Sequence, residues 1–269
     1  MSILLTGGTG FVGQGIRKIL NKKNISVTVL SRNTIELMSN EKGLMNTDLL
    51  NLSEYDFRNI IEPHENVIHS AWYVNPNDYT YSFKNIEHLD ASLKLSKAIA
   101  SYKNKSLIGL GTCLEYDLTP GILYPHNCEK PENIYSSCKL AYKNITKEIL
   151  KNTNNRFIWA RLFYLYGENE YQQRLYPSIK KAIKEKKPLA LSSGENIRDF
   201  IEVNVAAEMI VNCLLIEDKF KIVNISTGKG QKIKDFVKFF AGDFSYLMKF
   251  GTRNDNFTEA PTIIGGHYK

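Results

Sequence analysis

A tyrosine and a lysine four residues apart, Tyr135 and Lys139, stand in the stretch "NIYSSCKLAYKN" at 133–144. On an α-helix, side chains at positions i and i+4 lie on the same face. An ammonium group beside a phenol stabilises the phenolate and lowers the pKa of the phenol from about 10 toward neutrality. Such a pair can exchange a proton with an oxygen atom of a substrate. The same spacing recurs in "YPSIK", between Tyr176 and Lys180, and a chain with 15 tyrosines and 35 lysines and arginines is expected to contain chance copies.

The position along the chain distinguishes the two copies. Tyr135 begins a helical pattern that follows a strand-like stretch, "SLIGLGT", ending at Thr112. The Thr112 hydroxyl can hold a substrate oxygen next to the phenol, and the three side chains then provide a general acid for the reduction of a carbonyl. Tyr176 comes later, in a helix whose first turn is indicated by Pro177. We therefore predict that Thr112, Tyr135 and Lys139 are catalytic and that the second pair is helix surface.

The glycine-rich stretch "TGGTGFVG" at 6–13 predicts a phosphate-binding turn. It lies between a strand-like run and a helical pattern, which is the setting that such a turn requires. Glycines permit a tight turn and close approach of the backbone to a pyrophosphate, and the free N–H groups of the helix N-terminus meet the negative charge. Two spacings are open, one starting from Gly7 and one from Gly8. The predicted contacts with a dinucleotide are Gly7, Gly10, Phe11, Val12 and Gly13.

The end of the second strand indicates which dinucleotide binds. A carboxylate there accepts a hydrogen bond from the adenosine ribose 2′-hydroxyl, whereas an arginine meets a 2′-phosphate. This chain has Ser31 and Arg32 at that place and no acidic residue before Glu36. We therefore expect NADP(H), with Arg32 holding the 2′-phosphate. NAD(H), with Arg32 as a solvated loop residue, is the alternative.

The elements that must position these groups alternate between strand and helix. Strands are expected at 2–6, 25–30, 66–72, 106–112 and 157–163, and helices at about 11–21, 82–101 and 133–151. This alternation predicts an α/β fold with a doubly wound, mostly parallel sheet. In such sheets ligands bind beyond the carboxyl ends of the strands, which here are Thr6, Ser31, Ser70, Thr112 and Phe163.

The regular pattern loosens after Gly167, which indicates a second, smaller lobe. We divide the chain into a dinucleotide-binding domain at 1–165 plus about 196–225, and a substrate-binding lobe at 166–195 and 226–269.

The composition narrows the classes of partner. The chain is 43% hydrophobic and 23% charged, as in ordinary soluble proteins. Its net charge of +7 comes from dispersed lysines without a basic arm, so no nucleic-acid partner is expected. No apolar run has the length of a membrane span and the N-terminus lacks a secretion pattern, so we expect no membrane association and a cytoplasmic location. The four cysteines and the five histidines show no metal-ligand spacing, so no metal is expected.

Several motifs resemble, in order, those of one family: "TGGTGFVG", "TDLL", "GT" at 111–112, "YSSCK", "RLFYLYG", "RDFIEVNVA" and "NISTGKG". Together they are similar to the extended short-chain dehydrogenase/reductases that act on nucleotide sugars, over nearly the whole chain. The resemblance implies a Rossmann-type sheet with a smaller C-terminal substrate-binding lobe. It also implies the same three catalytic residues, with Lys139 touching the nicotinamide ribose as well.

The resemblance implies further contacts. Asp48 and Leu49 would lie near the adenine and Ala71 beside the cofactor. The substrate diphosphate would lie near Arg174, Arg198 and Arg253. A homodimer would form through the helices at 82–101 and 133–151.

Departures from the family pattern restrict the reaction. The 4,6-dehydratases of the family carry Asp-Glu directly after the threonine, where this chain has Cys113 and Leu114, so dehydration is not expected. Cys113 is expected to be a small buried filler. Tyr164 stands where relatives often have an asparagine that contacts the substrate. The asparagine usual in the long fourth helix has no obvious counterpart, and the nearest positions hold His88 and Asp90.

What remains is hydride transfer coupled to one proton at an alcohol or ketone carbon. The leading hypothesis is an NADPH-dependent reductase of a nucleotide-activated 4-keto-6-deoxy sugar, which the resemblance associates with deoxysugar supply for surface polysaccharide. The first alternative is a nucleotide-sugar 4-epimerase with tightly bound NAD. The second is a non-catalytic NADP-binding sensor, which has no need for a tuned phenol.

His69 and Trp72 lie in the strand expected at 66–72, and Tyr73 follows it. Trp72 and Tyr73 are candidates for the sugar pocket, with lobe packing as the alternative. His69 is expected to be a hydrogen-bonded structural histidine, because no nucleophile neighbours it. The full set predicted to bind substrate is Trp72, Tyr73, Thr112, Tyr164, Arg174, Arg198 and Arg253.

Overall fold

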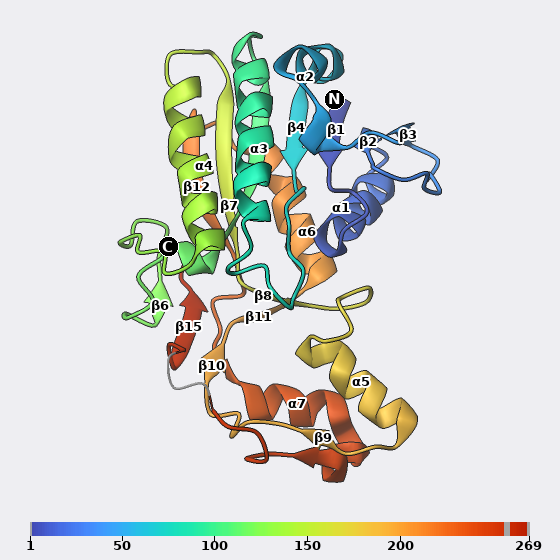
Figure 1. Cartoon of the computed structure of the whole chain (residues 1–269), viewed down its shortest axis with the longest axis vertical. Helices are drawn as coiled ribbons and strands as arrows, with labels where there is room; N and C mark the ends of the chain where they lie inside the picture. The colour runs from blue at the N-terminus through green and yellow to red at the C-terminus, as the bar shows by residue number, and fades with distance from the viewer. Residues whose placement is uncertain (1, 256–258, 268–269) are drawn as a thin grey trace.

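A seven-stranded parallel sheet forms the larger part of the computed structural model, which describes residues 2–255 and 259–267 (Figure 1). The strand order is β12–β7–β5–β4–β1–β2–β3. The strands are β1 (Ser2–Thr6), β2 (Ser26–Leu30), β3 (Glu41–Leu44), β4 (Asn66–His69), β5 (Ser106–Thr112), β7 (Arg156–Leu162) and β12 (Phe220–Ile225). This is the predicted doubly wound α/β sheet.

Helices cover both faces of the sheet (Figure 1). On one face lie α1 (Phe11–Lys22) and α6 (Val203–Asn212), which pack against each other. On the other face lie α2 (Glu54–Ile61), α3 (Lys84–Ala100) and α4 (Ile134–Leu150). Because both faces are buried, the central strands are apolar at nearly every position.

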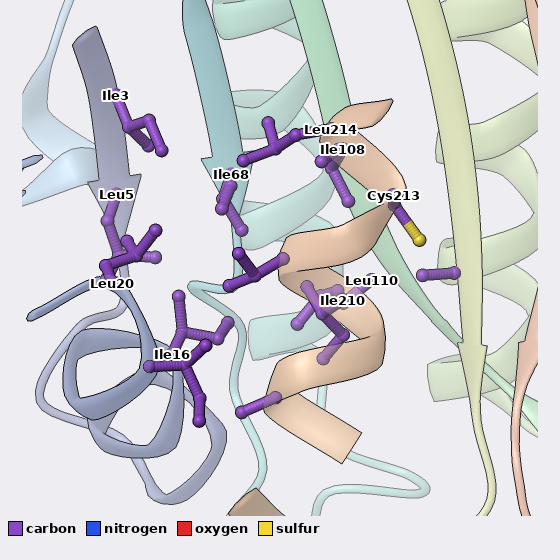
Figure 2. Packing of buried hydrophobic residues seen from close by; sticks show 14 of the residues in the cluster. Ile3, Leu5, Ile16, Leu20, Ile68, Ile108, Leu110, Ile210, Cys213 and Leu214 are labelled. Atoms are coloured by element: carbon purple, nitrogen blue, oxygen red, sulfur yellow. The ribbon is translucent and has the colours of Figure 1, made fainter. Parts of the chain in front are cut away.

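The core between the sheet and the α1–α6 layer is made of aliphatic side chains (Figure 2). Ile3 and Leu5 of β1 and Ile68 of β4 point from the sheet toward Ile16 of α1 and Ile210 of α6. All five side chains are fully buried. Burial of this layer fixes α1, and with it the glycine-rich turn that leads into α1, against the sheet.

The strand order reverses at β1, which pairs with β2 on one side and β4 on the other. Thr6 stands opposite Leu30 and His69 in these two ladders, and Thr112 of β5 stands opposite Leu162 of β7. The carboxyl ends of the strands therefore share one edge of the sheet. An open α/β sheet offers a crevice for ligands at such a reversal of strand order.

A smaller lobe lies beyond this edge (the lower part of Figure 1). It contains α5 (Leu175–Glu185), α7 (Ile233–Ala241) and the short pair β9 (Leu189–Ala190) and β14 (Met248–Lys249). Its separate core includes an aromatic cluster of Tyr166, Tyr176, Phe236 and Phe240.

Short strands connect the lobe with the sheet. β8 (Tyr164–Tyr166) pairs with β11 (Phe200–Glu202), and a four-stranded sheet joins β13 (Gln231–Lys232), β10 (Ile197–Arg198), β15 (Thr262–Gly265) and β6 (Ile122–Leu123). The short 3₁₀ helices are η1 (Leu49–Asn51), η2 (Cys113–Glu115), η3 (Cys213–Leu215) and η4 (Gly242–Leu247). The division of the chain at residue 165 remains a prediction, and it would fall within β8.

The strands and helices expected in the first half are present with bounds that shift by a few residues. The strand expected at 66–72 ends already at His69. Among the described residues, β3, α2, α6 and β12 are elements whose bounds the sequence pattern did not give. No described helix combines the length and the apolar character needed to cross a membrane.

Candidate active site

A cleft of about 670 Å³ opens at the carboxyl edge of the sheet and extends to the lobe. Most of the predicted site residues line it. They are Gly7, Gly10, Phe11, Val12, Ser31, Arg32, Asp48, Leu49, Ala71, Trp72, Thr112, Tyr135, Lys139, Tyr164, Arg174 and Arg198. Gly13, Tyr73 and Arg253 are not part of its lining.

The glycine-rich turn approaches the end of β4 so closely that side chains are excluded. Gly7 has φ +71°, and a Cβ there would lie 2.5 Å from the Ala71 nitrogen. A Cβ at Gly13 would lie 2.1 Å from the Gly7 oxygen. Gly8 instead faces the core, where a Cβ would meet the Val29 side chain at 2.6 Å. The spacing that starts from Gly7 is therefore the one that shapes the turn.

The N-terminus of α1 is open to an anion. Gly10 is the N-cap, no side chain caps the helix, and its first turn carries no acidic residue. The unpaired N–H groups and the positive end of the helix dipole face the cleft at this point. This cradle fits the pyrophosphate of a dinucleotide.

The adenosine end of the cleft lies beside β2. Arg32 is exposed there and lines the cleft, whereas the Ser31 hydroxyl is buried and donates a hydrogen bond to the Asn33 carbonyl at 2.8 Å. The Asp48 carboxylate accepts a hydrogen bond from the Leu50 nitrogen at 3.1 Å and caps η1. The end of β2 therefore presents a cation to the cleft.

Tyr135 stands in the first turn of α4, which Asn133 caps by accepting a hydrogen bond from the Ser136 nitrogen at 3.0 Å. Its ring is 9% exposed and meets the edge of Tyr79 with 5.0 Å between ring centroids. Burial raises the pKa of Tyr135 well above its ordinary value, while a hydrogen bond with Thr112 acts in the opposite direction. The phenol is therefore protonated, as a proton donor must be.

Lys139 is buried one turn later, and among the described residues no hydrogen bond joins it to the phenol. Its Nζ donates a hydrogen bond to the Leu110 carbonyl at 2.8 Å and lies 3.9 Å from the centroid of the Trp72 ring. Burial lowers the pKa of Lys139 to about 7, and the Glu115 carboxylate opposes this effect.

These contacts correct the expected tuning of the phenol. The sequence suggested that Lys139 lowers the pKa of Tyr135 toward neutrality, but in this structure the pKa of Tyr135 is raised. The reason is that burial desolvates the phenol, whereas the ammonium is directed to a carbonyl and an indole.

The substrate side of the cleft carries two arginines. Arg198 is 2% exposed, and its guanidinium donates to the Ile197 carbonyl at 2.9 Å and to Glu259 at 3.0 Å. It also lies 5.3 Å from the centroid of the Tyr164 ring. Arg174 is exposed, and its guanidinium lies 5.3 Å from the centroid of the Tyr79 ring. The cleft thus pairs two cations with aromatic rings, Arg198 with Tyr164 and Arg174 with Tyr79.

Two residues expected to bind substrate lie elsewhere. The Tyr73 hydroxyl donates to Asp78 at 2.8 Å, and its ring lies under the Lys84 ammonium, because the chain turns away after Trp72. Arg253 is exposed on the lobe, where its backbone nitrogen donates to the Leu191 carbonyl at 3.0 Å. Neither side chain lines the cleft.

The second tyrosine–lysine pair is only partly surface. Tyr176 is half-buried, packs against Tyr166 and Phe240, and lines the lobe end of the cleft. Lys180 is exposed, with its Nζ 5.5 Å from the centroid of the Tyr176 ring. The expectation of a plain helix surface is therefore wrong for Tyr176, because α5 turns this ring into the aromatic core of the lobe.

Tyr79, Glu170 and His88 are among the cleft residues that were not predicted as site residues. Tyr79 packs on Tyr135, and the Glu170 carboxyl has a buried Oε2 without a hydrogen-bond partner among the described residues. Burial raises the pKa of Glu170 to about 7. Burial also lowers the pKa of His88 to about 4, and its Nδ1 likewise has no partner within the described part of the chain. His88 and Asp90, the two positions noted in the sequence, both lie on α3. His88 faces the cleft, while Asp90 pairs with Lys94 at 2.7 Å on the surface.

The structural roles expected for His69 and Cys113 are confirmed. His69 is buried and bonds Thr6 at 2.7 Å and Ser92 at 2.8 Å, and its burial lowers its pKa to about 3. Cys113 is 4% exposed, and burial raises the pKa of its thiol to about 12. Within the described residues, no three His, Cys, Asp or Glu side chains group as metal ligands do.

Comparisons with known proteins agree with this geometry. The model of the "NAD dependent epimerase/dehydratase family" matches residues 3–226. A relative from Aggregatibacter actinomycetemcomitans, a dTDP-6-deoxy-L-talose 4-dehydrogenase (NAD(+)), is 22% identical over 263 residues. The match covers 93% of this chain and 93% of the relative.

Two solved structures share the fold. One is a UDP-N-acetylglucosamine 4-epimerase from Methanobrevibacter ruminantium M1 in complex with UDP-N-acetylmuramic acid, with TM-score 0.87 and 20% identity, covering 98% of this chain and 89% of that one. The other is a UDP-glucuronic acid 4-epimerase from Bacillus cereus in complex with UDP-glucuronic acid and NAD, with TM-score 0.86 and 19% identity, covering 99% and 90%.

Proposed function

The chain belongs to the NAD-dependent epimerase/dehydratase family, an NAD(P)-dependent oxidoreductase of the extended short-chain type, and from this premise we propose that it reduces a nucleotide-activated 4-keto-6-deoxy sugar with NADPH. The observation that carries the proposal is the buried, protonated phenol of Tyr135 in a cleft that also holds the glycine cradle. A reductase requires a proton donor at the oxygen of its ketone.

Each residue of the set has its own role in the proposed reaction. When bound, the nicotinamide cofactor supplies a hydride to C4 of the sugar. Tyr135 donates its proton to the C4 oxygen, and the Thr112 hydroxyl holds the same oxygen. Lys139, whose pKa burial lowers to about 7, offers positive charge beside the site at and below neutral pH. That charge stabilises the phenolate that proton donation leaves behind.

The walls near Thr112 suit a deoxy sugar. Trp72, Cys113, Leu114 and Phe163 line this part of the cleft, and none of them offers a carboxylate to a 6-hydroxyl group or to a dehydration step. Arg174 and Arg198 also line the cleft, where their charges would attract the diphosphate of a nucleotide sugar. The related talose dehydrogenase also acts, by its name, on a 6-deoxy sugar at C4.

The choice of NADPH rests on Arg32, the exposed cation at the end of β2. The related talose dehydrogenase is named for NAD(+), and the Bacillus cereus epimerase was solved with NAD, so NAD(H) is the competing cofactor. The two are separated by comparing cofactor dissociation constants for the same protein.

A 4-epimerase is the second candidate, favoured by the two solved structures that carry that name. The same three catalytic residues would serve it, with the hydride returned to the opposite face of C4. An epimerase retains its cofactor and consumes none, whereas a reductase consumes one NADPH for each turnover.

The deciding experiment measures NADPH consumption with a panel of CDP-, dTDP-, GDP- and UDP-4-keto-6-deoxy sugars, alongside interconversion of UDP-hexoses without added cofactor. Stoichiometric NADPH loss with at least one ketosugar is expected. Interconversion of UDP-hexoses without net cofactor change, together with no ketosugar reduction, would replace the proposal with the epimerase.

We further propose a homodimer through α3 and α4, in a cytoplasmic enzyme that supplies a deoxyhexose for polysaccharide. Phe83, just before α3, is 76% exposed, Ile86 on α3 is 51% exposed and Ile145 on α4 is 43% exposed. The two helices pack side by side on the same face of the sheet (Figure 1). Exposed apolar side chains of this size on adjacent helices favour association with a second copy.

A further inference from the structure

A fully buried carboxylate, Glu115, lies three residues after Thr112 and has no part in the proposed proton transfer. Its Oε1 accepts a hydrogen bond from the Thr112 backbone nitrogen at 2.8 Å. Its Oε2 accepts from the Trp159 indole nitrogen at 2.9 Å and from the Arg161 Nε at 2.8 Å. Both oxygens are therefore committed, one to the strand end that carries Thr112 and one to β7.

The network continues to the helix that carries the other two catalytic residues. Arg161 also binds Glu129 through its Nη2, and Glu129 in turn binds Lys143 of α4. Lys143 lies one helical turn after Lys139 and two turns after Tyr135. A continuous chain of charge-assisted hydrogen bonds thus links the end of β5, β7 and α4.

The surroundings of Glu115 leave it little freedom. A Cβ added at Gly111 would lie 2.5 Å from its Oε1 and 2.4 Å from the Trp159 indole nitrogen. The backbone nitrogen of Lys130 donates to its carbonyl at 3.0 Å, which ties the loop that carries Glu129 to the same residue. Thr112 cannot shift along β5 without breaking these contacts.

A buried ion network can contribute to stability alone, so its position relative to the reacting groups decides whether it also affects the reaction. Two facts connect this one with the reaction. Its links end on the two elements that carry Thr112, Tyr135 and Lys139. The Glu115 carboxylate is also an electrostatic neighbour of both titrating residues, since it raises the pKa of Tyr135 and of Lys139.

We propose that Glu115 is a positioning residue, which holds the Thr112 hydroxyl in register with Tyr135 and Lys139 and is itself anchored through Arg161, Glu129 and Lys143. The inference rests on the proposed role of these three residues as the catalytic set, and it holds equally for a reductase and for an epimerase. No residue of the network reacts with the substrate.

Within the described residues, four other titratable groups lie near Tyr135 and Lys139. Tyr79 and Cys113 act on Tyr135, and His69 and His88 lie near Lys139. Substitution of Glu115 leaves these four in place. A change in the titration of Lys139 after such a substitution is therefore attributable to the carboxylate.

The test compares Glu115→Gln with Glu129→Gln, which breaks the network at its distal end. The amide that Glu115→Gln introduces can still accept from the Thr112 nitrogen but carries no charge. Removal of one carboxylate leaves a buried excess of positive charge, so Glu115→Gln/Lys143→Met is made as well, with Lys143→Met as its control. This double variant keeps the Arg161–Glu129 pair and removes one charge of each sign.

In the ketosugar assay, Glu115→Gln and the double variant are expected to lower kcat roughly ten- to a hundredfold with KM values changed by less than about threefold, since misplacement of a catalytic group acts on kcat. Without the carboxylate, the pKa values of Tyr135 and Lys139 fall, so the decline of kcat at high pH moves to lower pH by about half a unit or more. Glu129→Gln and Lys143→Met are expected to lower kcat less and to leave that decline where it is.

The second readout needs no substrate. Protein labelled with ¹³C at lysine Cε is titrated by NMR, with the Lys139 signal assigned from Lys139→Met, and the pKa of Lys139 is expected to be lower in Glu115→Gln and in the double variant than in the wild type. An unchanged Lys139 pKa, or an equal shift in Glu129→Gln, overturns the inference. If the wild type turns over no ketosugar and no UDP-hexose, the proposed function fails, and the NMR titration still decides the role of Glu115.

Discussion

The Lys139 ammonium lies 3.9 Å from the centroid of the Trp72 ring, so the cation rests on an indole face, and its hydrogen bond goes to a backbone carbonyl and not to the phenol of Tyr135. An indole attracts a cation through its ring quadrupole but cannot accept the ammonium's hydrogen bonds as water does. One N–H is satisfied by the Leu110 carbonyl at 2.8 Å. No other hydrogen bond of this ammonium is present within the described part of the chain, so its remaining protons could meet a ligand in the cleft.

Lys139→Met is expected to abolish turnover and to stabilise the fold at neutral pH by roughly 0.5–2 kcal/mol, as removal of functional strain often does. The pKa of Lys139 is lowered in the fold, from 10.5 to about 7. The unfolded chain therefore binds more protons between these two values, and the stability of the wild type rises with pH in this window. The gain from Lys139→Met should be largest below about pH 7 and should shrink toward pH 10.5. Urea unfolding of both proteins across this range checks it, and Lys180→Met, a surface change, should show no such trend.

Tyr135→Phe is expected to lower kcat by about 10²–10⁴-fold, because the proton donor is lost while the ring remains. Cofactor binding, followed by NADPH fluorescence, should stay within about threefold of the wild type, since a single neutral hydrogen bond contributes about 1 kcal/mol. Near-normal turnover in Tyr135→Phe would remove this phenol from the mechanism.

Arg32→Ala is expected to weaken NADPH binding by roughly 10- to 100-fold while it changes NADH binding little, because a charge-assisted contact with a phosphate contributes more than a neutral one. Isothermal titration with both cofactors gives the comparison. Equal weakening of the two would show that Arg32 does not read the 2′-phosphate, and would favour NAD(H).

Gly13→Ala is expected to destabilise the fold by about 1–3 kcal/mol, because the new methyl group would meet a backbone oxygen that cannot move aside. The distance from that Cβ to the Gly7 oxygen would be 2.1 Å. Gly15→Ala in the same helix is the matched control, since a Cβ at Gly15 would come no closer than 3.1 Å to a neighbour, the Ala207 side chain. Thermal unfolding should show a large loss for Gly13→Ala and a small change for Gly15→Ala; similar losses would contradict the close approach of the turn.

Ile145→Asp is expected to convert the proposed dimer into a monomer, because a charge would be buried in an apolar contact between α4 helices. Light scattering after size exclusion measures the mass. Leu215→Asp is the control, because Leu215 is 73% exposed on η3, away from α3 and α4. A wild-type protein that is already monomeric at micromolar concentration would refute the proposed interface.

The sheet and its glycine turn were predictable because their signals are local. The apolar run of β1, the glycines and the following amphipathic helix adjoin one another in the sequence, and their spacing is dictated by steric rules. α2 carried an equally local signal that was overlooked: Ser53 and Asp56 form a capping box.

The tuning of the candidate catalytic residues was not predictable, because it depends on partners from distant segments. Trp72 follows β4, and Glu115 meets Arg161 of β7 inside the core. Glutamate is usually an exposed residue, so nothing near Glu115 in the sequence marks it as buried. Trp72 and Tyr73 are neighbours of similar character, and only the path of the chain after β4 determines which of them lines the cleft.

The strands that lead from the sheet to the lobe, β8 and β11, run side by side as one ribbon, with Tyr164 opposite Phe200 and Tyr166 opposite Glu202. Both crossings are therefore coupled, and any movement of the lobe relative to the sheet would carry the two strands together. If the proposed function holds, looser pairing in this ribbon would change the grip on nucleotide sugar and the enclosure of the nicotinamide at the same time, although no residue of the ribbon needs to touch the reacting atoms.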